Sequence, residues 1–460
     1  MANKSIFKKN QTLTLKIEDI TNLGFGVGRA NGAVIFVSGA VKGDTCEVKI
    51  IKEASSYYVA RVERFISYSP LRDKERCGNA KCRACAYRDI SYAAELEIKG
   101  EAVRGAFIKA GLPEVNVLPV IPSPKLTEYR NKAQYPIGIT KDGSYEIGFF
   151  APKSHRVCEA ARCPMAPSVF GDIIETLRAF FKKHSLSVYD EESGSGLLRH
   201  IYLRRSEALG SVLLTLVING DSIPHRDELI ETVRLAHPYV SGILLNVNRK
   251  KTNVILGEKF ICLFGDDYIK DTLCGVELKI TAPAFYQVNH GSASIIYTKA
   301  RELAALSKDD VLLDLFCGAG SIGLSMADSV KEVIGIEIIE SAVECAKENA
   351  RSNGICNAEF YVGDATETER LLAIAEKARG AAIRPDVIVL DPPRAGCDER
   401  LLRYVAGLSP KRIVYVSCNP TTLARDAKIM KELGFDIGDV SAVDMFPGTG
   451  HVESVVCLTR

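Results

Sequence analysis

The pattern of hydrophobic and polar positions divides the chain into three stretches. In the first, residues 11–67, short β-type runs such as "LTLKIEDI" and "GAVIFVSGA" are separated by glycine-rich turns, among them "TNLGFGVGRANG". About five short strands at such close spacing predict a small closed barrel of the OB or SH3 type. Proline and charged residues in "SYSPLRDKER" then indicate that this unit ends near residue 70.

The rest of the chain changes from a mixed pattern to a regular one. The segment "SYAAELEIKGEAVRGAFIKAGL" predicts an amphipathic helix that ends at Gly111. Residues 120–280 mix strands with two or three helices and show no regular alternation. From about residue 285, five strand-like runs alternate with helical segments, and two further strands follow with only "PGTGH" between them. This pattern predicts a doubly wound α/β sheet extended by a terminal pair of strands.

The composition of the chain indicates the class of protein and the cellular compartment to expect. A chain of 460 residues, 47% hydrophobic and 25% charged, is typical of a globular protein with about three domains. Residues 1–68 carry ten Lys/Arg against six Asp/Glu, a modest indication of nucleic-acid binding. The N-terminus has no apolar signal core, and no apolar run reaches the roughly 18 residues of a membrane helix. Fourteen cysteines in such a chain are expected to be thiols or ligands, which indicates a cytoplasmic protein without membrane contact.

A nucleoside-binding edge is indicated where the first regular strands end. In "DLFCGAGSIG", residues Gly318, Gly320 and Gly323 have the G-x-G-x-x-G spacing that lets a backbone turn closely around a ligand. Glu337 ends the next strand, where it could hold both ribose hydroxyls, and Asp364 ends the third, where it could face an adenine. An ordinary turn with two surface acids is the alternative. Matching context at three strand ends favours a nucleoside-type cofactor, and the terminal strand pair looks like that of class I S-adenosyl-L-methionine-dependent methyltransferases.

A reactive edge is expected beside it. Asp391 ends the fourth strand, and in "RIVYVSCNPTT" Pro420 stops the fifth just after Cys418. An antiparallel last strand would bring Glu453 to the same edge. Methylation of C5 of a uracil needs such a set, because a thiolate must add to C6 and a base must then remove the C5 proton. The alternative for Cys418 alone is a small buried packing residue.

These motifs resemble those of the RNA (uracil-5-)-methyltransferases, specifically the ribosomal-RNA branch that carries an iron–sulfur cluster. The resemblance runs almost end to end and is strongest in "FYQVN", "DLFCGAGSIG", "LDPPRAG", "VSCNPTTLARD" and "MFPGTGHVESVVCL". It implies that Cys418 is the nucleophile and Glu453 the base. It also implies that Gln287, Phe316, Glu337, Asp364 and Asp391, with the turn at Gly318 and Gly320, line the methyl donor and the target base.

Two further roles follow from the same resemblance. Phe285 is expected to stack on a flipped-out uracil, and Gln287 or Asp391 to contact that base. Gly448 and Gly450 lie in the loop before Glu453, where relatives often have bulkier residues, so a more mobile loop is expected there.

Three cysteines form a second candidate site. Cys77, Cys82 and Cys85 have C-x4-C-x2-C spacing, and Cys163 is a distant fourth ligand with which Cys158 could compete. Four thiolates fit either zinc or an iron–sulfur cluster, and four unrelated buried thiols are the alternative. The resemblance implies a structural 4Fe–4S cluster, with zinc as the second choice.

RNA is the expected partner. The N-terminal barrel resembles the TRAM domain, an OB-like RNA-binding module. Basic residues of the middle stretch, in "EYRNKAQYPIG" and "RHIYLRR", match basic segments of the family's central domain and are hypothetical RNA contacts: Arg130, Lys132, Arg199, Arg204 and Arg205.

The predicted domains are a TRAM barrel at 1–67, a central iron–sulfur and RNA-binding α+β domain at 68–90 and 120–280, and a Rossmann-like methyltransferase domain at 91–119 and 281–460. The predicted function is methyl transfer to C5 of a uridine in 23S ribosomal RNA by a monomer. The transfer-RNA branch, which typically lacks both barrel and cysteine cluster, is one alternative. A non-catalytic RNA-binding or ribosome-assembly protein with the same fold is the other.

Overall fold

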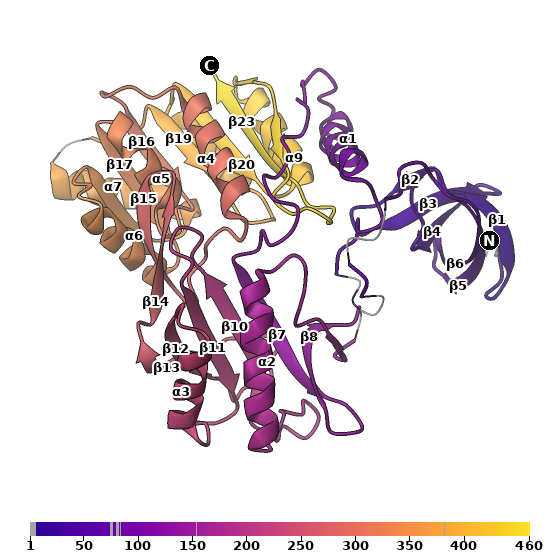
Figure 1. Cartoon of the computed structure of the whole chain (residues 1–460). Helices are drawn as coiled ribbons and strands as arrows, with labels where there is room; N and C mark the ends of the chain where they lie inside the picture. The colour runs from indigo at the N-terminus through magenta and orange to yellow at the C-terminus, as the bar shows by residue number, and fades with distance from the viewer. Residues whose placement is uncertain (1–5, 74–76, 80–81, 83, 153, 381) are drawn as a thin grey trace.

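The computed structural model describes residues 6–73, 77–79, 82, 84–152, 154–380 and 382–460. Figure 1 shows three bodies: the N-terminal barrel on one side, a domain coloured magenta below, and the C-terminal α/β domain, from orange to yellow, above. Among the described residues, no helix is long and apolar enough to cross a membrane.

The barrel is one six-stranded sheet with the order β1-β5-β6-β4-β3-β2. Inward and outward positions alternate along its strands, so that Ile35, Val37, Val48 and Ile50 are fully buried. Its strands are β1 Thr12–Lys16, β2 Asp19–Ile20, β3 Phe25–Ala30, β4 Ala33–Ser38, β5 Thr45–Glu53 and β6 Tyr58–Ser67.

The middle stretch forms a seven-stranded sheet with the order β13-β12-β11-β10-β7-β8-β9. Every residue of β11 is buried, because this strand lies near the middle of the sheet. Two helices accompany the sheet, α2 Ser168–Lys183 and α3 Arg226–Ala236. The strands are β7 Lys132–Ile139, β8 Tyr145–Phe150, β9 Val157–Glu159, β10 Leu198–Arg205, β11 Val212–Ile218, β12 Val240–Val247 and β13 Lys259–Gly265.

The C-terminal sheet confirms the predicted doubly wound architecture. Strands β16 to β20 are parallel in the order β18-β17-β16-β19-β20, and β23 pairs antiparallel with β20. The strands are β16 Val311–Leu315, β17 Glu332–Glu337, β18 Ala358–Val362, β19 Val387–Leu390, β20 Arg412–Ser417, β21 Asp436–Ile437, β22 Ser441–Val443 and β23 Glu453–Thr459. The helices are α4 His290–Ala304, α5 Ser321–Met326, η1 Ala327–Ser329, α6 Glu340–Ser352, η2 Ala365–Glu367, α7 Thr368–Arg379, α8 Glu399–Gly407 and α9 Pro420–Glu432.

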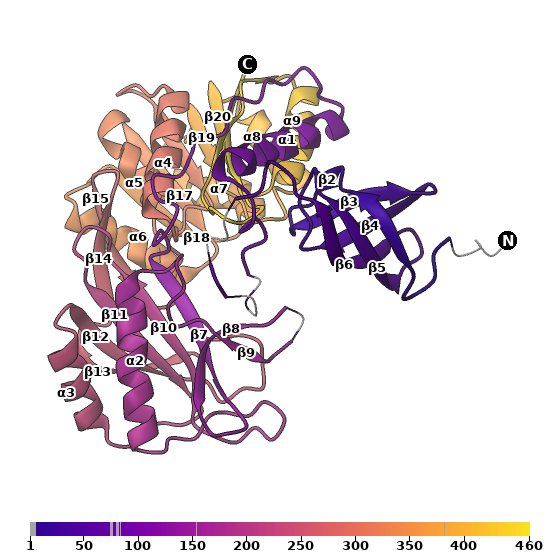
Figure 2. The ribbon, with the colours of Figure 1, turned by 45° about the vertical axis from the view of Figure 1, so that its right-hand side comes forward.

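The predicted early helix is α1, Tyr92–Ala110. The side chain of Ser91 caps its N-terminus, and Gly111, with φ +85°, ends it in the left-handed conformation that glycine adopts without strain. Helix α1 packs on α9, more than 300 positions away, and Val103 and Phe107 share a buried cluster with α9. Figure 2 shows α1 between the C-terminal domain and the barrel.

A hairpin, β14 Tyr268–Leu273 and β15 Val276–Thr281, falls inside the range expected for the central domain. Its buried residues Leu278 and Ile280 belong to the same core cluster as residues of the C-terminal sheet, and β15 contacts α6. We therefore propose a boundary before this hairpin; the division of the chain into independent folding units stays a prediction.

Candidate active site and cysteine cluster

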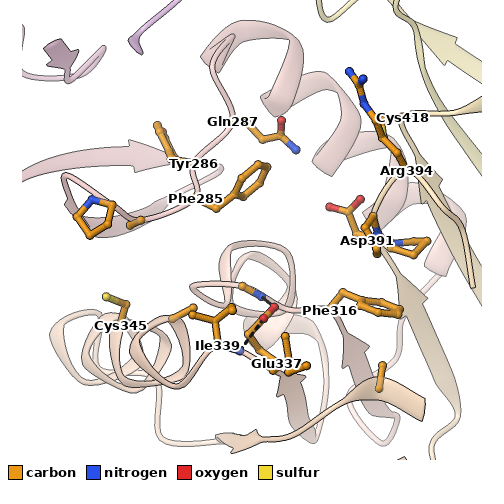
Figure 3. A pocket seen from close by; sticks show the side chains of 18 of the residues that line it. Phe285, Tyr286, Gln287, Phe316, Glu337, Ile339, Cys345, Asp391, Arg394 and Cys418 are labelled. Carbon is orange, nitrogen blue, oxygen red and sulfur yellow. Dashed lines mark hydrogen bonds between the residues drawn. The ribbon is translucent and has the colours of Figure 1, made fainter. Parts of the chain in front are cut away.

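The carboxyl ends of the parallel strands open into a cavity of about 1070 Å³. Nine of the sequence-predicted residues line it, and they come from seven separate segments of the chain: Phe285, Gln287, Phe316, Gly318, Glu337, Asp364, Asp391, Cys418 and Glu453. Figure 3 shows the side chains of Phe285, Gln287 and Asp391 pointing toward one another across this space. Gly320 is not part of the lining.

The glycine turn after β16 is tied to Glu337. Gly318, with φ +56°, donates its backbone N–H to Glu337 Oε2 at 3.1 Å, and Ile339 donates to Oε1 at 2.9 Å. Phe316 also has a positive φ, +66°, which is uncommon for a non-glycine residue and frequent at functional sites. The turn is thereby held open toward the cavity with a carboxylate at its edge.

The other two glycines of the motif serve the packing. Gly320, with φ +78°, precedes the first residue of α5. A Cβ on Gly323 would lie 2.8 Å from Oδ2 of the fully buried Asp314, which accepts the Gly323 N–H at 2.9 Å. Burial raises the pKa of Asp314 to about 7. Gly323 therefore allows the close approach of α5 to β16. Asp314, the first residue of the same motif, is a buried acid for which no role was predicted.

Asp364 lies at the end of β18 and caps η2. Its Oδ1 accepts the backbone N–H and the hydroxyl of Thr366, both at 2.8 Å, and these hydrogen bonds lower the pKa of Asp364. The carboxylate therefore stays ionised beside the cavity.

Cys418 lies between a strand and a helix, at the edge of the cavity. Strand β20 ends at Ser417, and Asn419 caps α9 by accepting the Thr421 N–H at 3.1 Å, with Pro420 as the first helical residue. The thiol is partly exposed, so Cys418 is not a core packing residue. Glu453, only 6% exposed, begins the antiparallel strand β23 and so faces the same cavity.

The acidic groups of the cavity influence one another. Burial raises the pKa of Asp391 to about 7, and burial and then the neighbouring Asp391 raise the pKa of Glu453 to about 8, against the opposing effect of Arg394. Burial, Glu453 and Asp391 also raise the pKa of the Cys418 thiol, which Arg394 partly offsets. Since all three groups are harder to ionise here than in water, a cationic ligand in the cavity would favour their anionic forms.

Two residues of α9, the helix that follows Cys418, bind the loop that follows Asp391, residues 391–398. The fully buried Asp426 accepts the Cys397 N–H at 2.8 Å and the Tyr415 hydroxyl at 2.6 Å through Oδ2. Arg425 Nη2 donates to the carbonyls of Ala395 and Cys397, both at 3.0 Å. The sequence identified these two residues only as the end of a motif; the structure assigns them to holding this loop against α9.

Asp426→Ala is expected to lower the free energy of unfolding by about 2–4 kcal/mol, because it leaves a buried N–H and a buried hydroxyl without their acceptor. Chemical denaturation followed by circular dichroism would measure the loss. The matched control is Asp436→Ala, at an exposed aspartate, for which a change within about 0.5 kcal/mol is expected. An equal loss in both variants would contradict the fastening role.

The loop between β15 and α4 presents the substrate-side residues. Phe285 is 69% exposed and projects into the cavity, while Asn131 Nδ2 donates to the Gln287 carbonyl at 2.8 Å. Arg204, fully buried, donates through Nη2 to the carbonyls of Ala282 and Ala284 at 3.2 and 2.6 Å. Arg204 therefore holds the start of this loop in place through its backbone carbonyls.

Two of the arginines predicted to contact RNA are buried in the protein. Arg204 is inaccessible, and Arg199, 5% exposed, donates to the carbonyls of Asn248 and Lys250 at 2.6 and 2.9 Å. The RNA-contact hypothesis is therefore wrong for both. Arg130 lines the cavity and keeps that hypothetical role.

The predicted cysteine ligands influence one another's pKa values. Burial and then the neighbouring Cys163, Cys82 and Cys77 raise the pKa of Cys85 to about 11, against the opposing effect of Arg130. The pKa of Cys163 is likewise raised by burial and then by Cys82 and Cys77. Cys158 adds to the raised pKa of Cys82. Cys163 thus lies near enough to all three cysteines of the motif for their charges to interact.

A compact group of candidate metal ligands lies apart from the cysteines. Within the described ranges, the group of three candidate ligands with all atoms within 4.8 Å is His184, His225 and Glu228, and no trio of the cysteines qualifies. The two imidazoles of that group stack, with their ring centroids 3.9 Å apart and their planes at 23°.

Two family models match this chain, one over the barrel and one over its C-terminal part. Residues 248–460 match the family model described as "tRNA (Uracil-5-)-methyltransferase", and residues 7–62 match the TRAM domain. The six-stranded N-terminal sheet is therefore a TRAM domain.

Full-length relatives are similar over nearly the whole chain. A protein of Halalkalibacterium halodurans named as an uncharacterized RNA methyltransferase is 38% identical over 98% of this chain and 97% of its own. One of Clostridium acetobutylicum with the same description is 38% identical over 98% of both.

A solved structure shares the architecture, including the barrel. The Pyrococcus abyssi tRNA (uracil-54, C5)-methyltransferase, in complex with S-adenosyl-L-homocysteine, superimposes with a TM-score of 0.77 and 28% identity, over 97% of this chain and 100% of that one. The chain therefore belongs to the S-adenosyl-L-methionine-dependent RNA (uracil-5-)-methyltransferase family.

Proposed function

We propose that this enzyme forms 5-methyluridine by covalent catalysis, with Cys418 as the nucleophile and Glu453 as the base. The observation that carries the proposal is the convergence of Cys418, Asp391 and Glu453 on one cavity that also contains the glycine turn and Glu337. A methyl-donor side and a reactive side therefore share one enclosed space.

The reaction needs one nucleophile and one base. The Cys418 thiolate adds to C6 of the uracil, and the electron pair of the C5–C6 double bond moves toward O4 to give an enolate. S-adenosyl-L-methionine supplies an electrophilic methyl group, which C5 attacks as the thioether leaves. The Glu453 carboxylate then removes the C5 proton, and the electrons of that C–H bond restore the double bond and expel the Cys418 thiolate from C6.

The remaining lining residues divide between the two ligands. On the donor side are the turn at Phe316 and Gly318 with Glu337 and Asp364, whose carboxylates suit ribose hydroxyls and the adenine amino group. On the uracil side the exposed ring of Phe285 offers a stacking surface, and Gln287 and Asp391 offer hydrogen-bonding groups to the base edge.

The rate at which free 5-methyluridine forms is expected to rise with pH through about 8 and to continue rising while the Cys418 thiol ionises. Glu453 accepts a proton only as a carboxylate, and its pKa is raised to about 8, so the active fraction grows as pH rises through that value. The raised pKa of Cys418 acts in the same direction, because only the thiolate attacks. Single-turnover rates between pH 5.5 and 9.5 measure this profile; a rate that is flat or falling across pH 6–8 would contradict it.

We propose 23S ribosomal RNA as the substrate, with transfer RNA as a second candidate. The Pyrococcus neighbour acts on transfer RNA and aligns over 97% of this chain, so the barrel does not separate the two substrate classes. A barrel therefore does not indicate the ribosomal branch. The choice of 23S ribosomal RNA rests on the resemblance of the sequence motifs to that branch.

Unmodified 23S ribosomal RNA and unmodified transfer RNA, offered together at equal molarity, would decide between the substrates. We expect the methyl label on one mapped uridine of the ribosomal RNA, with kcat/KM at least about tenfold above that for transfer RNA. The reverse ratio would assign the enzyme to transfer RNA, and no label in either would contradict the proposed activity.

We further propose that Cys77, Cys82, Cys85 and Cys163 hold a 4Fe–4S cluster with a structural role. The proposal is supported by the thiol chemistry, since four thiolates are the usual ligands of such a cluster, and by the mutual electrostatic influence of these cysteines. Methyl transfer has no redox step, so the cluster is not required for electron transfer.

Cys163→Ser is expected to lower bound iron and sulfide by more than about half in anaerobically purified protein, since one of four thiolate ligands is lost. Cys158→Ser is the matched control and should keep about four iron atoms per chain. Iron and acid-labile sulfide analysis measures both. Equal loss in the control, or zinc in place of iron, would contradict this ligand set or this metal.

A further inference from the structure

The catalytic loop, defined here as residues 444–453, is held from behind by helix α1. Lys99, only 1% exposed, donates to Asp444 Oδ1 at 2.6 Å, to Glu95 Oε1 at 2.8 Å and to the Phe446 carbonyl at 3.2 Å. Glu95 Oε1 also accepts the Gly448 N–H at 2.7 Å. A buried acid–base–acid group therefore fixes the first half of the loop that leads to Glu453.

The middle of the loop is also held by the segment that follows the cysteine motif. Tyr87, two residues after Cys85, donates its backbone N–H to the Gly448 carbonyl at 2.8 Å, and its hydroxyl donates to the Thr21 carbonyl of the barrel at 3.2 Å. The ring of Tyr87 is 2% exposed and packs in a cluster with barrel and α1 residues. One residue thus joins the catalytic loop, the barrel and the cysteine segment.

The barrel also touches the loop directly, at Gly450. A Cβ on Gly450 would lie 2.1 Å from the Asn22 carbonyl oxygen and 2.6 Å from Asn22 Cα, atoms of the barrel backbone that cannot rotate away. Gly448 adopts φ +84°, where glycine is favoured. The glycines expected to loosen this loop therefore have the opposite role, because they allow the barrel and the cysteine segment to pack on it.

We propose that the TRAM barrel is a positioning element for catalysis: its turn at residues 21–24, together with Tyr87, holds the catalytic loop so that Glu453 reaches the C5 proton. The barrel then has a second role besides binding RNA, and Tyr87, Gly448 and Gly450 are positioning residues. This inference rests on the proposed function, since it assigns Glu453 as the base.

Gly450→Ala is the direct test, since the backbone of Gly450 has no left-handed φ and only the lack of space opposes a side chain. We expect kcat to fall by about 10- to 100-fold with no rise in KM for RNA. A displaced base also slows the last step, so a covalent protein–RNA adduct should accumulate, visible as a denaturant-resistant gel band. Gly105→Ala, in α1 with nothing within 4 Å of its Cβ, is the matched control and should behave as wild type.

Tyr87→Phe, which removes only the hydroxyl bond to Thr21, should shift kcat and adduct in the same direction by a smaller factor; it decides the question if Gly450→Ala fails to fold by circular dichroism. A raised KM with unchanged kcat, or a lost kcat without adduct, would overturn the inference. Glu453→Gln, assayed in parallel, distinguishes failure of the positioning role from failure of the proposed function. Adduct in that variant alone refutes the positioning role and leaves the proposed function standing, whereas adduct in none refutes the proposed function and the inference with it.

Discussion

Replacing Cys418 with alanine is expected to lower methyl transfer by at least about 10⁴-fold and to abolish any covalent RNA adduct. C5 of uracil is a poor nucleophile until a thiolate adds to C6, and among the cavity-lining residues Cys418 lies beside Asp391 and Glu453. Incorporation of labelled methyl groups into RNA, read over hours for the variant and seconds for the wild type, measures the loss.

Binding of the methyl donor should survive the Cys418→Ala change. The donor side of the cavity is built from the Gly318 turn and Glu337, whose hydrogen bonds do not involve Cys418. Calorimetry with S-adenosyl-L-homocysteine should therefore give a Kd within about threefold of wild type. Cys356→Ala, at an exposed cysteine outside the cavity, is the matched control for activity. Residual turnover above about a tenth of wild type would exclude Cys418 as the nucleophile.

Glu453→Gln is expected to lower turnover by about 10²–10⁴-fold and to leave the methylated adduct on Cys418. The amide is nearly isosteric but cannot accept the C5 proton, so the thiolate has no route out. Denaturing gels with labelled RNA would show the adduct, and single-turnover analysis would show a normal first step. Glu432→Gln, at an exposed glutamate, should turn over normally. Free 5-methyluridine product at the wild-type rate would contradict the base assignment.

The same substitution should stabilise the fold at neutral pH. The pKa of Glu453 is about 8 in the folded protein and about 4.3 in an unfolded chain, so between these values the folded state binds more protons and stability falls as pH rises. Because glutamine does not ionise, the Glu453→Gln variant does not lose this stability as pH rises. The gain in melting temperature of Glu453→Gln should therefore be small near pH 4 and largest at pH 8 and above, the opposite of what a damaged core would show.

The edge of the sheet could be predicted because its residues carry local signals. Strand-ending patterns placed Glu337, Asp391 and Cys418 at carboxyl ends of parallel strands, and parallel strands bring those ends to one edge. The position of Glu453 depended on an antiparallel last strand, which the pairing of β20 with β23 confirms.

The contacts that support this edge could not be predicted in the same way, since they join distant parts of the chain. Lys99 meets Asp444 across 345 positions, and Tyr129 donates to the Pro447 carbonyl across 318. A basic run such as "RHIYLRR" looks the same whether its arginines face solvent or, like Arg204, lie fully buried. Local composition reports charge but not the direction of a side chain.

Trapping with 5-fluorouridine RNA tests the central claim most directly. After methylation, C5 would carry fluorine in place of the proton that Glu453 removes, so elimination stops and the RNA stays bound to the attacking sulfur. Peptide mass spectrometry should then find a methylated nucleotide on the peptide that contains Cys418, and only when S-adenosyl-L-methionine is present. A nucleotide on another residue, or 5-methyluridine formed from normal RNA with no trapped complex from the fluorinated one, would contradict covalent catalysis by Cys418.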